Sequence, residues 1–163
     1  MTGDSPKPRH SHSTVVWKES ILMYGGVLSD ERVCNKLYHA TMMDSTVYFK
    51  ELETIPSLPA RCSSSSVVHG DSLILLGGAD WYPGVPEVVI VNLINLTASF
   101  VQLQLPEEPI WTLGWTCGLL TNDEKSKEDH VNIVSVAGGC DCKDFNEDEA
   151  FFTPPTIIKL ALD

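Results

Sequence analysis

The sequence is poor in arginine and has no long apolar run. Arginine occurs at three of 163 positions, and 22 acidic against 11 basic side chains give a formal net charge of −11. Because nucleic-acid binding needs clustered basic residues to neutralise phosphates, no nucleic-acid-binding face is indicated. The apolar runs are far shorter than the roughly 20 residues of a transmembrane helix, and the polar N-terminal stretch lacks a signal-peptide core. We therefore expect no membrane partner.

Cysteines are few, and a helical pattern is missing. The five cysteines are odd in number and irregularly spaced, unlike the framework of a small disulfide-rich secreted protein. This predicts a reduced, cytoplasmic protein. No long window has apolar residues at helical spacing, while the hydrophobic content of 43% is ordinary for a globular chain. The length suits one domain.

Three apolar runs each end in a pair of glycines, namely Gly25-Gly26, Gly77-Gly78 and Gly138-Gly139. Arg9 and Arg61 lie 52 residues apart, and each precedes one of the first two pairs at the same offset. We call the 52-residue separation of the two arginines the repeat length. Because two independent spacings agree, the sequence predicts an internal repeat in which these arginines and glycines are structural. We expect one glycine of a pair to adopt positive φ, and the guanidinium to bind carbonyls of an adjacent unit.

Each repeat is expected to form four short strands, because apolar and β-branched runs alternate with Gly, Pro, Asp and Ser. The expected strands are 13–17, 21–24, 36–41 and 47–52 in the first unit, and 65–68, 73–76, 88–92 and 100–103 in the second. The third unit gives only 115–120, 131–136 and 156–162. Its fourth strand is missing.

A four-stranded unit of about 50 residues has the length of a kelch repeat. The predicted fold class is all-β: a kelch-type β-propeller segment of about three blades in an open, incomplete ring. The predicted divisions are a tail at 1–8, blade 1 at 9–60, blade 2 at 61–110, and an incomplete blade 3 with acidic insert loops at 111–163. A generic β-sandwich with coincidental glycines is the alternative.

Three stretches resemble a known family. They are 8–13 (PRHSHS), 83–93 (PGVPEVVIVNL) and 138–163, which begins GGC and ends FFTPPTIIKLALD. In this order they are similar to the C-terminal kelch region of the tRNA wybutosine-synthesising protein 4 family, also called leucine carboxyl methyltransferase 2. The resemblance implies an accessory propeller of an S-adenosylmethionine-dependent enzyme family that completes wybutosine on phenylalanine tRNA.

The family's methyltransferase domain has no counterpart in this sequence, which lacks a glycine-rich strand-to-helix turn for the cofactor. No catalytic or cofactor-binding residue is therefore carried over, and S-adenosylmethionine is implied only for the full-length family. The implied partners are further propeller blades or the methyltransferase domain of a longer protein, together with phenylalanine tRNA or a protein. The alternative function is a protein-binding kelch scaffold, such as a ubiquitin-ligase substrate receptor.

Two groups of residues are candidates for chemistry or contact. Trp81 and Tyr82, in the loop after Gly78, are contact candidates because aromatic rings can stack on bases, although such rings also wedge between blades. Cys140 and Cys142 could be thiolate ligands of a zinc ion. Zinc motifs, however, place two to four residues between paired cysteines, whereas one residue separates this pair, and no second pair follows. We therefore predict no metal site.

Negative charge is concentrated in the third unit. Residues 121–149 carry nine acidic and three basic side chains, a net charge of −6 out of −11. The first 120 residues carry twelve acidic and seven basic side chains, a net charge of −5. The acidity therefore disfavours the binding of tRNA phosphates, and it does so most strongly at the insert loops of the third unit.

Overall fold

Short antiparallel strands make up the computed structural model. It describes residues 2–78, 80, 87–102, 116–120, 130–136, 138–139, 151–152 and 156–161. Within these ranges there are sixteen strands and no helix, and the sheets do not close into a ring. The predicted all-β class with an open arrangement is therefore confirmed.

The first two units form sheets of four antiparallel strands. The first contains β3 (Ser13–Trp17), β4 (Ser20–Tyr24), β6 (Leu37–Met43) and β7 (Thr46–Leu52). The second contains β8 (Ser65–His69), β9 (Ser72–Leu76), β10 (Glu87–Asn92) and β11 (Thr97–Gln102). The strands β8 and β9 begin and end one repeat length after β3 and β4, so the repeat in the sequence is also a repeat in space.

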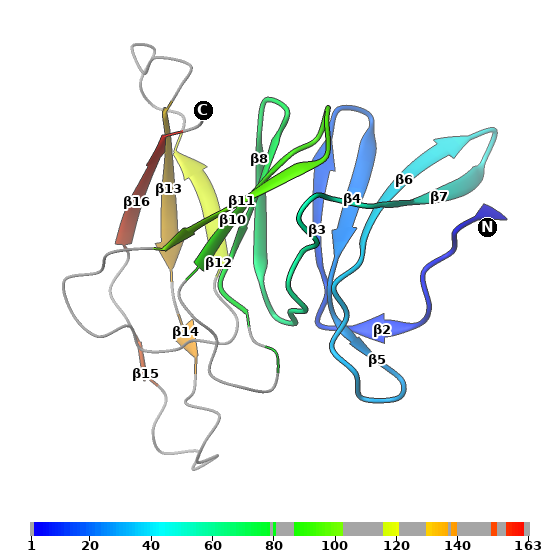
Figure 1. Ribbon diagram of the computed structural model, residues 1–163, viewed down its shortest axis with the longest axis horizontal. Coiled ribbons are helices and arrows are strands. Elements are labelled where there is room, and N and C mark those ends of the chain that lie inside the picture. The colour runs from blue at the N-terminus through cyan, green and yellow to red at the C-terminus, as the bar shows by residue number, and fades with distance from the viewer. Residues whose placement is uncertain are drawn as a thin grey trace.

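The third sheet has three described strands, β12 (Thr116–Leu120), β13 (His130–Val136) and β16 (Thr156–Ala161). Two small ribbons complete the topology: β2 (Arg9–His10) with β5 (Val27–Leu28), and β14 (Gly138–Gly139) with β15 (Phe151–Phe152). Figure 1 shows the three sheets standing side by side in chain order, with β3 beside β8 and β8 beside β12. First strands lying next to one another are typical of blades arranged around an axis.

The core lies between the first two sheets. Leu22, Tyr24 and Leu37 on one face of the first sheet pack against Leu73 and Leu75 of the second. Alternation along each strand sends these side chains to the same face, which period-2 geometry requires. The interface between the first two units therefore contains a hydrophobic core cluster.

The segment that precedes each of the first two units crosses the outer edge of that unit's sheet. Ile55, after β7, forms a parallel bridge with Thr97 of β11, and its backbone bonds Leu96 and Ala98 at 2.9 and 3.0 Å. The N-terminal segment does the same, because β1 (Thr2–Gly3) pairs in parallel with β7. The sequence pattern treats residues 1–8 as a tail, whereas the structure adds two of them to the first sheet as a fifth strand.

Both glycines of each of the first two pairs adopt positive φ, where the sequence predicts one. The φ angles are 71° and 91° at Gly25 and Gly26, and 61° and 83° at Gly77 and Gly78. A Cβ on Gly26 would lie 2.7 Å from the carbonyl oxygen of His10, and a Cβ on Gly78 would lie 2.7 Å from that of Cys62. The same backbone approach thus recurs one repeat length later.

Gly70 gives a matched control for this approach, because it also has positive φ (57°) but a Cβ there meets nothing within 4 Å. We expect Gly70→Ala to lower the free energy of unfolding by about 1 kcal/mol, the cost of the left-handed conformation alone. Gly26→Ala should cost clearly more, because the backbone of His10 must also move. Urea denaturation measures both, and equal losses would show that the close approach has no energetic weight.

Candidate functional site

The connections between strands divide the sheets into two ends. Short turns at residues 18–19, 44–45, 70–71 and 93–96 lie at what we call the turn end. The longer connections 25–36 and 53–64 leave the opposite end, where Gly77 and Gly78 follow β9, and we call it the loop end. Because binding residues concentrate on longer loops held by rigid strands, the loop end is the candidate functional face.

Arg9 organises the loop end of the first unit. Its Nη1 donates to the carbonyl oxygen of Gly25 and to Sγ of Cys34, both at 3.1 Å. The guanidinium carbon lies 5.1 Å from the ring centre of Tyr38, within the range of a cation–π contact. Arg9 therefore fixes the glycine pair of its own unit, whereas the sequence suggests a carbonyl of an adjacent one.

Arg61 connects the first unit to the second. Its Nη1 donates to the carbonyl oxygen of Gly77 at 2.8 Å, which repeats the Arg9–Gly25 bond one repeat length later. Its backbone faces the other way: the N–H donates to the carbonyl of Cys34 at 3.2 Å, and its carbonyl accepts from the N–H of Gly26 at 2.9 Å. Arg61 is 7% exposed, so the contacts it makes are shielded from water.

We expect Arg61→Ala to lower the free energy of unfolding by about 2 kcal/mol, because a buried charge-assisted hydrogen bond to Gly77 is lost. Arg61→Lys should recover part of the loss, since an ammonium keeps the charge without the planar fork. Arg32→Ala is the control, because Arg32 is exposed and pairs with Asp30 on the surface. Urea denaturation measures all three, and an Arg61→Ala protein as stable as Arg32→Ala would contradict a structural role.

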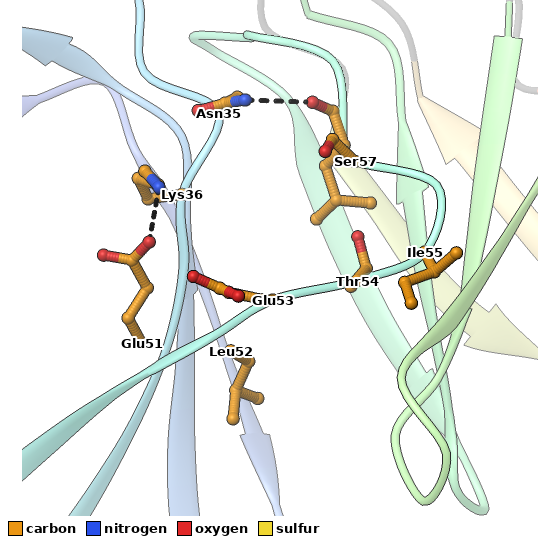
Figure 2. A pocket seen from close by; sticks show the side chains of 9 residues that line it. Asn35, Lys36, Glu51, Leu52, Glu53, Thr54, Ile55 and Ser57 are labelled. Atoms are coloured by element: carbon orange, nitrogen blue, oxygen red, sulfur yellow. Dashed lines mark hydrogen bonds and ion pairs between the residues drawn. The ribbon is translucent and has the colours of Figure 1, made fainter.

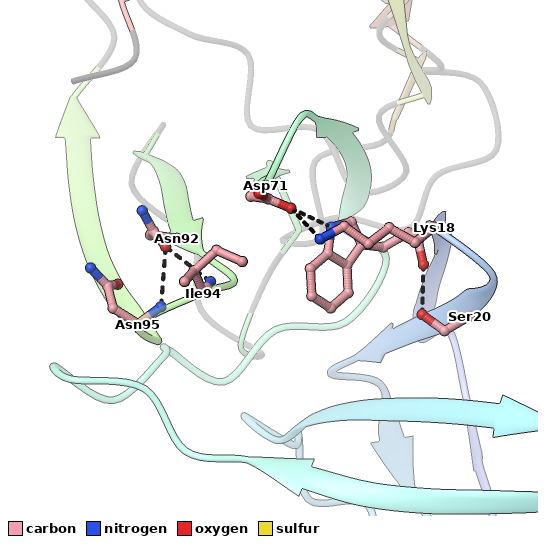
Figure 3. Close-up of polar contacts among 7 residues, drawn as sticks. Lys18, Ser20, Asp71, Asn92, Ile94 and Asn95 are labelled. Atoms are coloured by element: carbon pink, nitrogen blue, oxygen red, sulfur yellow. Dashed lines mark hydrogen bonds and ion pairs between the residues drawn. The ribbon is translucent and has the colours of Figure 1, made fainter.

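At the turn end, Asp71 joins the two units a second time. The carboxylate accepts from Nζ of Lys18 at 2.9 Å and from Nε1 of Trp17 at 3.2 Å, and the Lys18–Asp71 pair is drawn in Figure 3. The hydrogen bond from Lys18 is the main reason that the pKa of Asp71 lies below its ordinary value. The sequence pattern alone did not predict this pair. Glu19 is an acid one repeat length before Asp71, and this recurrence of an acid in the same turn is a signal that could have indicated it.

The adjacent turn at 93–96 is stabilised within its own unit. Oδ1 of Asn92 accepts from the N–H groups of Ile94 and Asn95 at 3.0 and 3.2 Å, as Figure 3 shows. These bonds complete the turn by residue 96, and β11 therefore begins at Thr97 rather than at the predicted position 100.

His39 lies under Trp17 on the first sheet, with the two ring centres 5.7 Å apart in an edge arrangement. Burial lowers the pKa of His39, and the positive charge of Lys50 lowers it further. As the pH falls below 6.5, the ordinary value for histidine, the unfolded chain binds a proton before the folded chain does. Stability must therefore fall until the pH passes the lower pKa of folded His39.

We expect the urea midpoint of the wild-type protein to decrease as the pH is lowered through this window. His39→Gln should remove that part of the decrease, because glutamine does not titrate. Chemical denaturation at a series of pH values on both sides of the ordinary histidine pKa measures the two slopes. Parallel slopes for the two proteins would show that His39 is not the titrating group.

A groove of about 400 Å³ lies at the loop end of the first unit. Figure 2 shows its lining, which comes from the residues just before β6, the end of β7 and the segment that follows β7. Nδ2 of Asn35 donates to the carbonyl of Leu58 at 3.3 Å, and Oγ1 of Thr54 donates to the carbonyl of Pro56 at 2.8 Å. The Asn35 bond joins two segments of the groove lining, and the Thr54 bond stabilises the bend within one of them.

The charged groups of the groove disfavour both phosphate binding and a role for Lys36 as a general base. Lys36 forms an ion pair with Glu51 at 2.5 Å, and Glu53 adds a second carboxylate. The hydrogen bond to Glu51 raises the pKa of Lys36, which keeps its amine protonated and unsuited to act as a base. One ammonium against two carboxylates suits a neutral or cationic ligand better than an anionic one.

Several sequence-derived candidates lie outside the described residues, namely Trp81, Tyr82, Cys140 and Cys142. The glycines Gly138 and Gly139 lie in the ribbon β14–β15. Across the described residues, no three His, Cys, Asp or Glu side chains gather in a way that could hold a metal ion, and no helix has the length and hydropathy to cross a membrane. Cys34 and Cys62 are buried, and neither forms a disulfide with another described cysteine.

Comparison with known proteins gives a distant and partial homology. No protein-family model matches the chain. Among curated proteins it is similar to tRNA wybutosine-synthesizing protein 4 of Rattus norvegicus, with 29% identity over 115 residues. The match covers 69% of this chain but 16% of the rat protein, so the chain spans a small share of that relative's length. The four-stranded antiparallel sheets of this chain are consistent with blade-like units.

Proposed function

We propose that the chain is a kelch-type propeller segment that assists a tRNA-modifying enzyme in completing wybutosine on phenylalanine tRNA, in the cytoplasm. The observation that carries the proposal is the homology to the rat wybutosine-synthesizing protein. The repeat supports it, because two four-stranded sheets related by a constant repeat length have the size expected of kelch units. In this view residues 9–60, 61–110 and 111–163 are two complete blades and one incomplete blade.

The segment contributes a binding and positioning surface, while S-adenosylmethionine and the methyl transfer belong to a methyltransferase domain elsewhere. Each described arginine already has a partner within the chain: Arg9 and Arg61 donate to glycine carbonyls, and Arg32 pairs with Asp30. Contact with RNA would therefore fall to aromatic side chains, which stack on bases without needing positive charge. Trp81 and Tyr82, which follow Gly78 in the sequence, are the proposed contacts.

The test uses cells that make wybutosine and in which the gene encoding this chain is disrupted. We expect nucleoside analysis of phenylalanine tRNA to show less wybutosine and more of its unfinished precursor, and wild-type protein should restore wybutosine. A Trp81→Ala, Tyr82→Ala double variant should restore less than wild type at equal protein level. Trp17→Phe serves as the aromatic control, because Trp17 bonds Asp71 at the turn end. Unchanged wybutosine in the disrupted cells would refute the proposal.

The acidic groove favours a second candidate function, a protein-binding kelch scaffold. Glu51 and Glu53 beside a single lysine suit a basic peptide better than a nucleic acid. The full transcript separates the two functions: a methyltransferase domain in it would support the tRNA role, and a ubiquitin-ligase adaptor domain would support the scaffold. If the scaffold function holds, Glu53→Lys should weaken binding of the protein partner, and a binding assay would measure the loss of affinity.

A further inference from the structure

The first sheet has an apolar face that the described residues cover only in part, because Ala40 and Tyr38 (the latter under Arg9) are buried while its other apolar side chains are exposed. Val16, Ile21 and Met42 lie on it and are 66%, 48% and 74% exposed. Val16 pairs with Ile21, and Ile21 pairs with Ala40 two residues before Met42, so the strand register places all three on the same side. Met23 shares this side of β4. We call this surface the open face.

The second sheet has the same surface, and there it is buried. Val68, Leu73 and Leu75 lie one repeat length after Val16, Ile21 and Met23, and Val68 pairs with Leu73 as Val16 pairs with Ile21. Leu73 and Leu75 are both 0% exposed. The same surface thus has fully buried leucines in the second unit and exposed apolar side chains in the first.

The cover on the second sheet is the opposite face of the preceding unit. Leu22, Tyr24 and Leu37 of the first sheet pack against Leu73 and Leu75 in a single apolar cluster. These three residues alternate with the residues of the open face along β4 and β6, so each unit has one face that covers and one face that is covered. This polarity identifies what the open face fits.

Charge at the turn end gives an independent sign of the same fit. Lys18 of the first unit binds Asp71 of the second, across the boundary between them. The residue one repeat length before Asp71 is Glu19, an exposed acid in the turn between β3 and β4. Glu19 therefore stands where a cation from a preceding unit would be received.

We propose that the open face is the docking surface for a further four-stranded unit of the same repeat, joined ahead of Arg9 in one polypeptide. That unit presents large apolar side chains equivalent to Leu22, Tyr24 and Leu37, and a cation equivalent to Lys18 that pairs with Glu19. The preceding position follows from the observed pair, in which the covering unit comes first in the chain. The proposal does not depend on the tRNA function.

The test is a tandem chain in which residues 1–60 are followed by residues 9–163, so that the first unit occurs twice at its natural repeat length. The covering face of the first copy then meets the open face of the second copy. We expect Ile21→Lys in the second copy to lower Tm by about 5 °C or more, as expected when a charge enters an apolar interface. In the natural chain the same substitution should shift Tm by less than about 2 °C.

Two controls separate docking from general effects of charge. Ile94→Lys changes a side chain that is 66% exposed at the turn end, away from the open face, and should be neutral in both chains. Lys18→Glu in the first copy of the tandem chain should lower Tm, and adding Glu19→Lys in the second copy should restore it. This restoration is specific to a Lys18–Glu19 pair across the new boundary.

Three outcomes would overturn the proposal. The first is an Ile21→Lys effect in the tandem chain no larger than in the natural chain. The second is a tandem chain that does not fold by circular dichroism, since the natural spacing is kept. The third is a natural chain that sediments as a concentration-dependent oligomer and becomes monomeric on Ile21→Lys. In that case a second copy of the chain, and not a preceding unit, would occupy the open face.

Discussion

The arrangement of the described units depends on backbone meeting backbone at the glycine pairs. A Cβ on Gly25 would collide with the carbonyl oxygen of Arg61, and the N–H of Gly26 donates to that same oxygen. Only residues without a side chain allow this distance. Because the sheets are rigid, the distance set at the loop end also determines whether their faces touch further along.

Two further contacts require that spacing. In the middle of the interface, Leu22 and Tyr24 reach Leu73 only when the sheets stand at packing distance. At the turn end, Lys18 reaches Asp71 across the same boundary. A glycine pair, an apolar layer and an ion pair thus follow one another along a single interface, and each is in register with the others because the repeat length is constant.

The sequence pattern predicted the strands well and their cross-unit partners poorly. The strands β3 and β8 were placed to within one residue, because local apolar alternation and turn residues determine them. The start of β11 was missed by three residues, since Asn92 shapes the turn through side-chain bonds that periodicity does not register.

The Lys18–Asp71 pair and the groove beside Lys36 join residues from distant segments, and nothing in one segment alone indicates its neighbour. The carbonyl acceptors of Arg9 and Arg61 were likewise assigned to an adjacent unit, because the sequence gives the arginine but not the direction of its side chain.

The crossing of each sheet's outer edge by the segment before it also has a consequence for synthesis on the ribosome. The strand β11 emerges after residue 55, and β7 emerges after residues 2 and 3, so the segment that will pair with each edge is already outside when the edge forms. An unpaired strand edge is the feature through which β-proteins most readily join neighbouring chains. For these two edges the nascent chain carries the pairing segment ahead of the edge itself, which shortens the time during which neighbouring chains on a polysome could pair through them.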